Sequence, residues 1–335
     1  MMHLLHDTWS QITDGLSFGF INLLQARRRA GKHSHEAFMA YCKQWEGLTL
    51  GDYYHLPEEV PLLDLPESGS FQTESPIPNP QFTDHPENDH LNCDIWLGPK
   101  GWQSPTMFML HGVMSVSDVG YRLWAKKLNS LGWTAIFFHL PYHYSRKPKN
   151  CLSGEIAFSS NLIRTAEGIR QAVIELRLVC RSLKAKGVPS IGLWGTSYGG
   201  WIASLLIMLE DIVTTAWLLE PIADVEHAIW KSPAAITMRQ QLRQIGITAE
   251  DVQRFLPFVC PSYHKPLLDM HKILLIGGSF DLIAPVVSMK KLHQLWNGSH
   301  FYEFRQGHIG YQLMPESLRL AQEIMPELFI KKENF

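Results

Sequence analysis

The sequence contains a serine between two glycines at the spacing of an activated nucleophile, Gly195-Thr-Ser197-Tyr-Gly199. The apolar run at 191–194 predicts a buried strand, and the apolar residues after position 200 recur at helical spacing. A serine on a tight strand-to-helix turn presents its hydroxyl group, and glycines beside it avoid clashes between the crossing backbones. We therefore predict that Ser197 is a nucleophile and that Gly195 and Gly199 support its turn.

A serine hydroxyl group needs a base to accept its proton and a carboxylate to orient that base. Asp281 and His308 follow Ser197 in this order, and each comes just after an apolar segment that predicts a strand. Glu220 and Asp224 follow the preceding predicted strand and are competing candidates for the acid. We favour Asp281 and expect Asp224 to cap a helix.

The tetrahedral intermediate of acyl transfer also needs backbone N–H donors for its oxyanion. The Tyr198 N–H, which directly follows the serine, is one candidate. The second should come from the segment His111-Gly112-Val113-Met114, which follows an early predicted strand. We favour the Val113 N–H, with Met114 as the alternative, and expect His111 and Gly112 to order this loop without titrating in catalysis.

The remaining pattern predicts the elements that position these residues. An edge strand is expected at 91–97, and a short strand is expected at 70–73. Further apolar segments that predict strands, with helical periodicity between them, lie at 106–110, 134–138, 191–194, 213–219, 272–276 and 300–304. This alternation predicts an α/β fold with a mostly parallel central sheet and helices on both faces, in which ligands bind at the carboxyl ends of the strands.

Together these marks resemble the α/β-hydrolase superfamily over roughly residues 91–330. They are His111-Gly112 after a strand, the Gly195–Gly199 turn, Gly278-x-x-Asp281 with Pro285 close behind, and Gly307-His308. The resemblance implies an α/β-hydrolase fold and a catalytic triad, and it implies neither a metal nor an organic cofactor. The run 139–148 departs from the glycine-rich turn common in the superfamily and resembles a poorly characterised branch with a Pro-Tyr and Arg-x-Pro run there.

The chain divides into an N-terminal helical segment with a covering loop at 1–90 and a hydrolase domain at 91–335, which carries a helical lid insertion at about 222–269. Apolar residues at positions 16, 20, 23 and 24 form one face of the first helix, ahead of the basic run 27–29. We favour a cap packed on the main domain over a helix lying on a membrane surface. Because every predicted site residue follows position 110, we predict that loss of residues 1–50 leaves the chemistry intact.

Two groups of residues leave alternatives open. Arg146 and Lys147 either bind an anionic headgroup or are solvated loop charges, and we favour the second. Four aromatic residues of the lid either line an acyl pocket or pack the lid onto the body: Trp230, Phe255, Phe258 and Tyr263.

Composition limits the classes of partner. The 335 residues carry a formal net charge of -2, so the composition shows no excess of positive charge of the kind that binds nucleic acid. The five cysteines form no C-x-x-C pair, which predicts reduced core thiols and a cytoplasmic location. No signal peptide and no apolar stretch of about 18 residues is found, so we predict no membrane span. Peripheral membrane contact and oligomeric state stay open.

The sequence thus predicts a serine hydrolase that cleaves a carboxylic ester with a sizeable, lipid-like acyl group through an acyl-enzyme. One alternative is a serine peptidase or amidase on the same fold. Another is a non-catalytic binding protein with a hydrolase fold, although no member of the predicted triad is missing.

Overall fold

The computed structural model describes residues 2–27, 34–77, 85–310 and 312–329. Within them one sheet has the strand order β1-β2-β4-β3-β5-β6-β7-β8, and the pairs from β4 through β8 are all parallel. The strands are β1 (Gly69–Glu74), β2 (His90–Trp96), β3 (Thr106–Leu110), β4 (Thr134–His139), β5 (Ile191–Thr196), β6 (Val213–Leu219), β7 (Ile273–Gly278) and β8 (His300–Phe304). The predicted mostly parallel sheet is confirmed.

The strand predicted as an edge at 91–97 is an inner strand. This strand, β2, pairs antiparallel with β4 on one side and with β1 on the other. The short strand predicted at 70–73 is confirmed as β1, and it takes the edge position. Residues 69–74 therefore join the sheet, although they precede the proposed boundary at residue 90.

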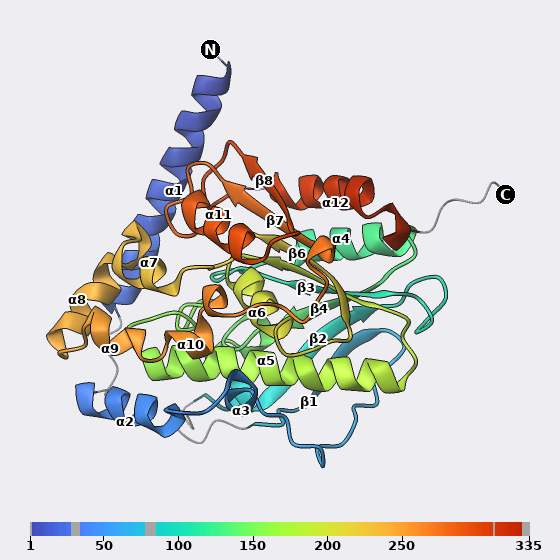
Figure 1. Ribbon diagram of the computed structural model, residues 1–335, viewed down its shortest axis with the longest axis horizontal. Helices are drawn as coiled ribbons and strands as arrows, with labels where there is room; N and C mark the ends of the chain where they lie inside the picture. Colours follow the sequence, from blue (N-terminus) through green and yellow to red (C-terminus); the bar gives the residue numbers. More distant parts are fainter. Residues whose placement is uncertain (1, 28–33, 78–84, 311, 330–335) are drawn as a thin grey trace.

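Helices cover both faces of the sheet because alternate side chains of each strand point to opposite faces (Figure 1). In β3, Phe108 and Leu110 join the larger core cluster, whereas Met107 and Met109 join the smaller one. The first cluster includes buried residues of α5 and α6, and the second includes buried residues of α4 and α12. The helices at these faces are α4 (Val119–Ser130), α5 (Leu162–Ala185), α6 (Tyr198–Leu206), α11 (Val286–Leu295) and α12 (Leu313–Ile324).

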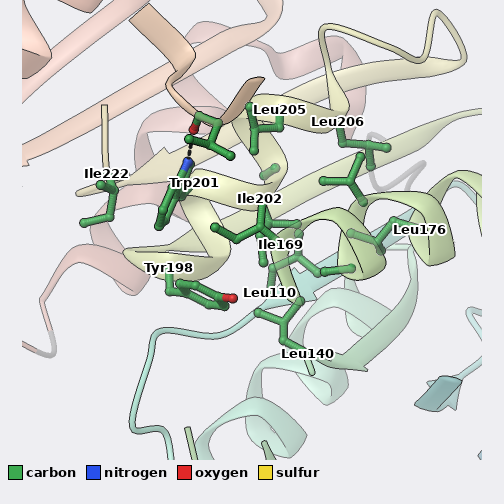
Figure 2. Packing of buried hydrophobic residues seen from close by; sticks show 14 of the residues in the cluster. Leu110, Leu140, Ile169, Leu176, Tyr198, Trp201, Ile202, Leu205, Leu206 and Ile222 are labelled. Carbon is green, nitrogen blue, oxygen red and sulfur yellow. Dashed lines mark hydrogen bonds between the residues drawn. The ribbon is translucent and has the colours of Figure 1, made fainter. Parts of the chain in front are cut away.

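The helix after the predicted nucleophile is entirely buried in the larger cluster. Figure 2 shows Trp201, Ile202 and Leu205 of α6 packed among apolar side chains from neighbouring elements. The Trp201 indole N–H donates a hydrogen bond to the Val259 carbonyl, which ties α6 to the insertion. A helix that is apolar on all sides is expected only where it is enclosed, and this enclosure fixes the turn before α6.

The insertion between β6 and β7 is helical, as predicted. It contains α7 (Val225–Trp230), α8 (Ile236–Gln244), α9 (Ala249–Gln253) and α10 (Leu256–Val259), with short 3-10 turns between them. Helix α9 begins with a reciprocal capping box between Thr248 and Asp251.

Helix α1 (Met2–Arg27) packs against this insertion (Figure 1). The Asn22 side chain donates to the Pro233 carbonyl at 2.9 Å and accepts from the Thr237 N–H at 2.8 Å. Other side chains of α1, such as those of the apolar residues Leu16 and Leu23, are exposed. The predicted cap on the main domain is therefore present, while the residues 28–29 of the predicted basic run lie outside the described part of the chain.

Two shorter helices, α2 (His35–Trp45) and α3 (Leu50–Tyr53), follow α1. The five cysteines are buried and none is joined to another in a disulfide, as predicted. No helix among the described residues combines the length and apolar character needed to cross a bilayer.

Candidate active site

Ser197 occupies a strained turn between β5 and α6. Its backbone angles are φ 52° and ψ −113°, a sparsely populated region for a residue with a side chain. A Cβ at Gly199 would lie 2.2 Å from the Leu110 carbonyl oxygen, and one at Gly195 would lie 2.6 Å from the Gly199 oxygen. Both predicted glycines are therefore required for the crossing of the two backbones that presents Ser197.

The structure brings the three predicted triad side chains together. Ser197 Oγ lies 2.7 Å from His308 Nε2, and His308 Nδ1 lies 2.7 Å from Asp281 Oδ2. The other Asp281 oxygen accepts hydrogen bonds from the N–H groups of Ile283 and Ala284 at 2.7 and 2.8 Å. Because Asp281 holds Nδ1 as the donor, Nε2 is left to accept the serine proton.

The charges around the imidazole favour its protonated form. Burial lowers the pKa of His308, but the adjacent Asp281 carboxylate and, less strongly, Asp14 raise it, so the net shift is upward. Burial raises the pKa of Glu220 well above its ordinary value, and the charge of Asp281 acts in the same direction. Burial and the neighbouring carboxylate thus favour the protonated form of Glu220.

The two competing acids have other partners. Glu220 receives a hydrogen bond from the Gln306 amide at 3.3 Å. Asp224 accepts from the His227 N–H at 2.9 Å and so caps α7, which confirms its predicted role. The two nitrogens of His308 are bonded to Asp281 and Ser197, so neither competing carboxylate holds the imidazole.

Three groups could in principle hold a cation. One ligand atom each from Glu220, Asp281 and His308 lies within 4.8 Å of the others, and all three side chains are buried. The described His308 nitrogens and Asp281 oxygens already bond to each other, to Ser197 and to backbone N–H groups. This hydrogen-bonded chain is suited to proton transfer.

The loop after β3 runs beside Ser197. A Cβ at Gly112 would lie 3.6 Å from Ser197 Cβ, and Val113, Met114 and Tyr198 line the cavity that Ser197 faces. Met114 has a φ of 61°. A Cβ at Gly154 would lie 2.6 Å from the Met114 backbone nitrogen, so the two loops are in close contact here. The Tyr198 N–H is at the first position of α6, where a helix has no internal acceptor for it.

His111 is fully buried and cross-links two loops. Its Nε2 accepts a hydrogen bond from the Leu140 N–H at 3.2 Å, and its Nδ1 lies 3.0 Å from the Gly112 carbonyl oxygen. Burial lowers the pKa of His111 well below its ordinary value, and the neighbouring His143 acts in the same direction. A neutral imidazole with a hydrogen bond at each ring nitrogen agrees with the expected role of His111 in ordering the loop.

The cavity at Ser197 has a volume of about 740 Å³ and a largely apolar lining. Helix α1 contributes one wall, which includes Leu16, Phe20 and Leu24, and the insertion contributes Ile222 and Ala235.

The four aromatic residues predicted for an acyl pocket do not line this cavity. Phe255 and Phe258 are buried and pack against Tyr53 of α3, with ring centroids 5.4 and 5.2 Å away. The interpretation that these two residues pack the insertion onto the body is therefore the one that the structure supports.

Both interpretations of Arg146 are wrong. Its side chain is fully buried, and its guanidinium donates to the two oxygens of Glu175 at 2.7 and 2.9 Å. It also donates to the carbonyls of His139 and Asn88, each at 3.1 Å. Arg146 therefore anchors the segment 139–148 to α5, while Lys147 is exposed, as a solvated charge should be.

The site includes residues of α1 that the sequence analysis missed. Asp14 accepts hydrogen bonds from the His308 and Ile309 N–H groups at 2.7 and 2.8 Å, and Ser10 Oγ accepts from the Gly307 N–H at 2.5 Å. These contacts place α1 against the loop that carries His308, while the prediction that loss of residues 1–50 leaves the chemistry intact stays a prediction. One signal was available, because Asp14 is the one charged residue between positions 8 and 26 of the sequence.

Comparison with known proteins identifies the architecture. No family model matches the chain. Two uncharacterized proteins of Mycobacterium tuberculosis, one from each of two strains, are 26% identical over 193 residues. The match covers 57% of this chain and 45% of each relative, so it spans less than half of their length.

Solved structures are similar over a larger share of the chain. A puromycin-hydrolyzing peptidase of Mycobacterium tuberculosis has a TM-score of 0.54 at 16% identity, over 78% of this chain and 40% of that one. An acylaminoacyl peptidase of Pyrococcus horikoshii has a TM-score of 0.54 at 14% identity, over 80% and 43%. A structure from Agrobacterium vitis described as a hydrolase has a TM-score of 0.50 at 17% identity, over 72% and 94%.

The chain has the α/β-hydrolase fold. At these identities the likeness establishes the fold alone. The α/β-hydrolase fold nevertheless explains why Ser197, Asp281 and His308 meet, since each follows a strand of one parallel sheet and all three lie at its carboxyl edge. It does not account for α1, which reaches this edge from the far end of the sequence.

Proposed function

We propose that this protein is a serine hydrolase that cleaves a carboxylic ester with a large, apolar, lipid-like acyl group. The observation that carries the proposal is a complete hydrogen-bonded chain, Ser197–His308–Asp281, that opens into an apolar cavity of about 740 Å³. A volume of this size lies within the range of small-molecule sites, ~300–1,000 Å³.

In the proposed reaction, Ser197 Oγ attacks the ester carbonyl carbon while its proton passes to His308 Nε2. Asp281 stabilises the resulting imidazolium, and the N–H groups of Tyr198 and Val113 stabilise the oxyanion. The intermediate expels the alcohol, which takes the proton from Nε2, and leaves an acyl group on Ser197. Water then attacks this acyl-enzyme, gives its proton to His308, and releases the carboxylic acid and the free serine.

The lining of the cavity supports an apolar acyl group. Side chains such as Leu16, Phe20 and Ile21 from α1, together with Ile222 and Ala235 of the insertion, offer contact area and no hydrogen-bond donors. A peptide in such a site would leave many of its backbone groups without partners, at a cost in binding. We therefore place ester hydrolysis ahead of peptide hydrolysis.

The peptidase alternative is supported by two of the similar structures, which are described as peptidases. The binding-protein alternative requires a site that does not turn over. Both are tested by the same assay, which uses p-nitrophenyl esters of increasing acyl length beside amino-acyl anilides, with fluorophosphonate labelling in parallel.

We expect turnover to rise with acyl length, and we expect the probe to label wild-type protein but not Ser197→Ala. The variant should lose at least about 10⁴-fold in turnover, since triad members act as a unit. Preference for anilides would move the assignment to a peptidase. Labelling that persists in Ser197→Ala would remove Ser197 as the nucleophile, and a protein that neither labels nor turns over would support the binding alternative.

A further inference from the structure

Helix α1 joins two parts of the molecule that bear on the site. Toward its C-terminal end, Gln25 accepts from the Met238 N–H through its side chain at 3.1 Å and from the Gln241 amide through its carbonyl at 3.0 Å. Eleven residues earlier, at Asp14, the helix reaches the loop that carries His308. Figure 1 shows this helix running along the side of the body from that loop to α8.

The contact with the loop is made by one buried carboxylate. Asp14 is 3% exposed, and its two oxygens accept from two consecutive backbone N–H groups, those of His308 and Ile309. A carboxylate that receives two parallel N–H bonds fixes the orientation of the peptide unit between them, because charge-assisted bonds are the shorter and stronger kind. Ser10, one turn earlier on α1, binds the preceding N–H of Gly307.

This contact, which we call the clamp (Asp14 with the N–H groups of His308 and Ile309), leaves no room for a side chain at Gly307. A Cβ at Gly307 would lie 2.3 Å from Asp14 Oδ2 and 2.6 Å from its Cγ. The Asp14 side chain therefore lies directly against the backbone of the loop. A shift of α1 is in this way transmitted to His308.

The charge of Asp14 also acts on the imidazole. The pKa of Asp14 is raised on balance, because burial outweighs the two backbone N–H bonds and His308, which lower it, and Asp281 adds to the rise. The charged and titratable groups that face His308 are Asp281 from the segment after β7, Asp14 from α1, and, beyond Asp281, Glu220, which directly follows β6. Asp14 is thus a second negative group near the imidazole, contributed by a different element from Asp281.

We propose that Asp14 is a positioning residue of the active site, which holds the His308 loop in its reactive place through the N–H groups of His308 and Ile309. This inference rests on the proposed hydrolase function. It makes α1 part of the catalytic apparatus rather than a cover on the cavity alone.

The test compares Asp14→Asn with the matched control Thr13→Ala. Thr13 neighbours Asp14 on the same helix, but its hydroxyl group donates to the Trp9 carbonyl within α1 and not toward the His308 loop. Asp14→Asn keeps the shape of the side chain, yet it offers one acceptor oxygen to two N–H groups and removes the charge. We expect Asp14→Asn to lower kcat by on the order of 10²-fold with KM little changed, and we expect Thr13→Ala to match wild type.

The pH profile separates positioning from a general loss of structure. Since the charge of Asp14 raises the pKa of His308, its removal should move the acid limb of kcat/KM to lower pH. The same shift should appear in an NMR titration of labelled histidine, with the His308 signal assigned by its loss in His308→Gln. This second measurement needs no turnover, so it tests the clamp even if the proposed ester activity fails.

Folding of each variant is checked by circular dichroism. If Asp14→Asn does not fold, Ser10→Ala removes only the Gly307 contact and should lower kcat by a smaller factor in the same direction. A folded Asp14→Asn protein with wild-type kcat, wild-type pH profile and an unshifted His308 titration would overturn the proposal. If wild-type protein neither labels nor hydrolyses esters, but the His308 titration shifts between wild type and Asp14→Asn as expected, the hydrolase function is overturned and the action of Asp14 on the His308 loop is retained.

Discussion

The buried ion pair between Arg146 and Glu175 should be a major determinant of stability. In the variant Arg146→Met, the long apolar side chain fills much of the space but removes four hydrogen bonds, two to Glu175 and two to backbone carbonyls. Glu175 would keep only the Ser75 hydroxyl group at 2.7 Å and the Gln171 amide at 3.0 Å. A carboxylate with no exposure and no cation would remain.

The expected cost follows from that uncompensated charge. Removing one partner of a buried ion pair destabilises proteins by about 3–5 kcal/mol. The two remaining neutral donors should keep Arg146→Met from exceeding this range. Adding Glu175→Gln removes the orphaned charge, so the double variant should be more stable than the sum of the two single effects predicts, by about 1–3 kcal/mol.

Urea unfolding, followed by circular dichroism and tryptophan fluorescence, measures these free energies of unfolding. Lys147→Met is the matched control, because Lys147 neighbours Arg146 and is exposed, and its change should stay within about 0.5 kcal/mol. An Arg146→Met protein within 1 kcal/mol of wild type, or a double variant whose effects simply add, would refute the reasoning.

Three further predictions concern the acids and the base. Asp281→Asn should slow turnover by up to about 10⁴-fold, whereas Asp224→Asn should cost at most about 1 kcal/mol of stability and leave turnover near normal; the reverse order would move the acid. Because the pKa of His308 is raised and its neutral form accepts the serine proton, kcat/KM should fall as pH drops, with a midpoint above the ordinary histidine value of ~6.5. A midpoint below it would contradict the electrostatic account. Glu220 binds a proton more tightly in the folded state than in the unfolded state, so the free energy of unfolding should decrease as pH rises above ~4.5 toward the raised pKa. Glu220→Gln should reduce that slope in urea unfolding at stepped pH, and an unchanged slope would show that Glu220 is not its source.

Much of the fold and of the candidate site could be predicted because the signals are local. An apolar run of five or six residues followed by a glycine turn identifies a strand end wherever it occurs, as at Ser197 and Asp281. The parallel topology then forces such ends to one edge, so the order of three residues along the chain was enough to propose a triad.

The remaining contacts depend on packing between distant segments. Asp14 and His308 are separated by 294 positions, and no periodicity in either segment indicates the other. Arg146 was misjudged for the same reason, because a charged residue in a loop is ordinarily solvated and its buried partner lies on another element, α5. The aromatic residues of the insertion were ambiguous because burial in a core and exposure to a cavity favour the same residue types.

The separation between Asp14 and His308 also bears on how the protein is made. During synthesis α1 emerges from the ribosome early, and the backbone groups that Asp14 binds emerge nearly three hundred residues later. Contacts of such long range form late, because the entropy of closing the loop must be met before they contribute. The nucleophile turn and its sheet can therefore assemble on a nascent chain whose histidine loop is still unanchored. Under the proposed function, hydrolytic competence should therefore appear only after the bulk of the fold has formed.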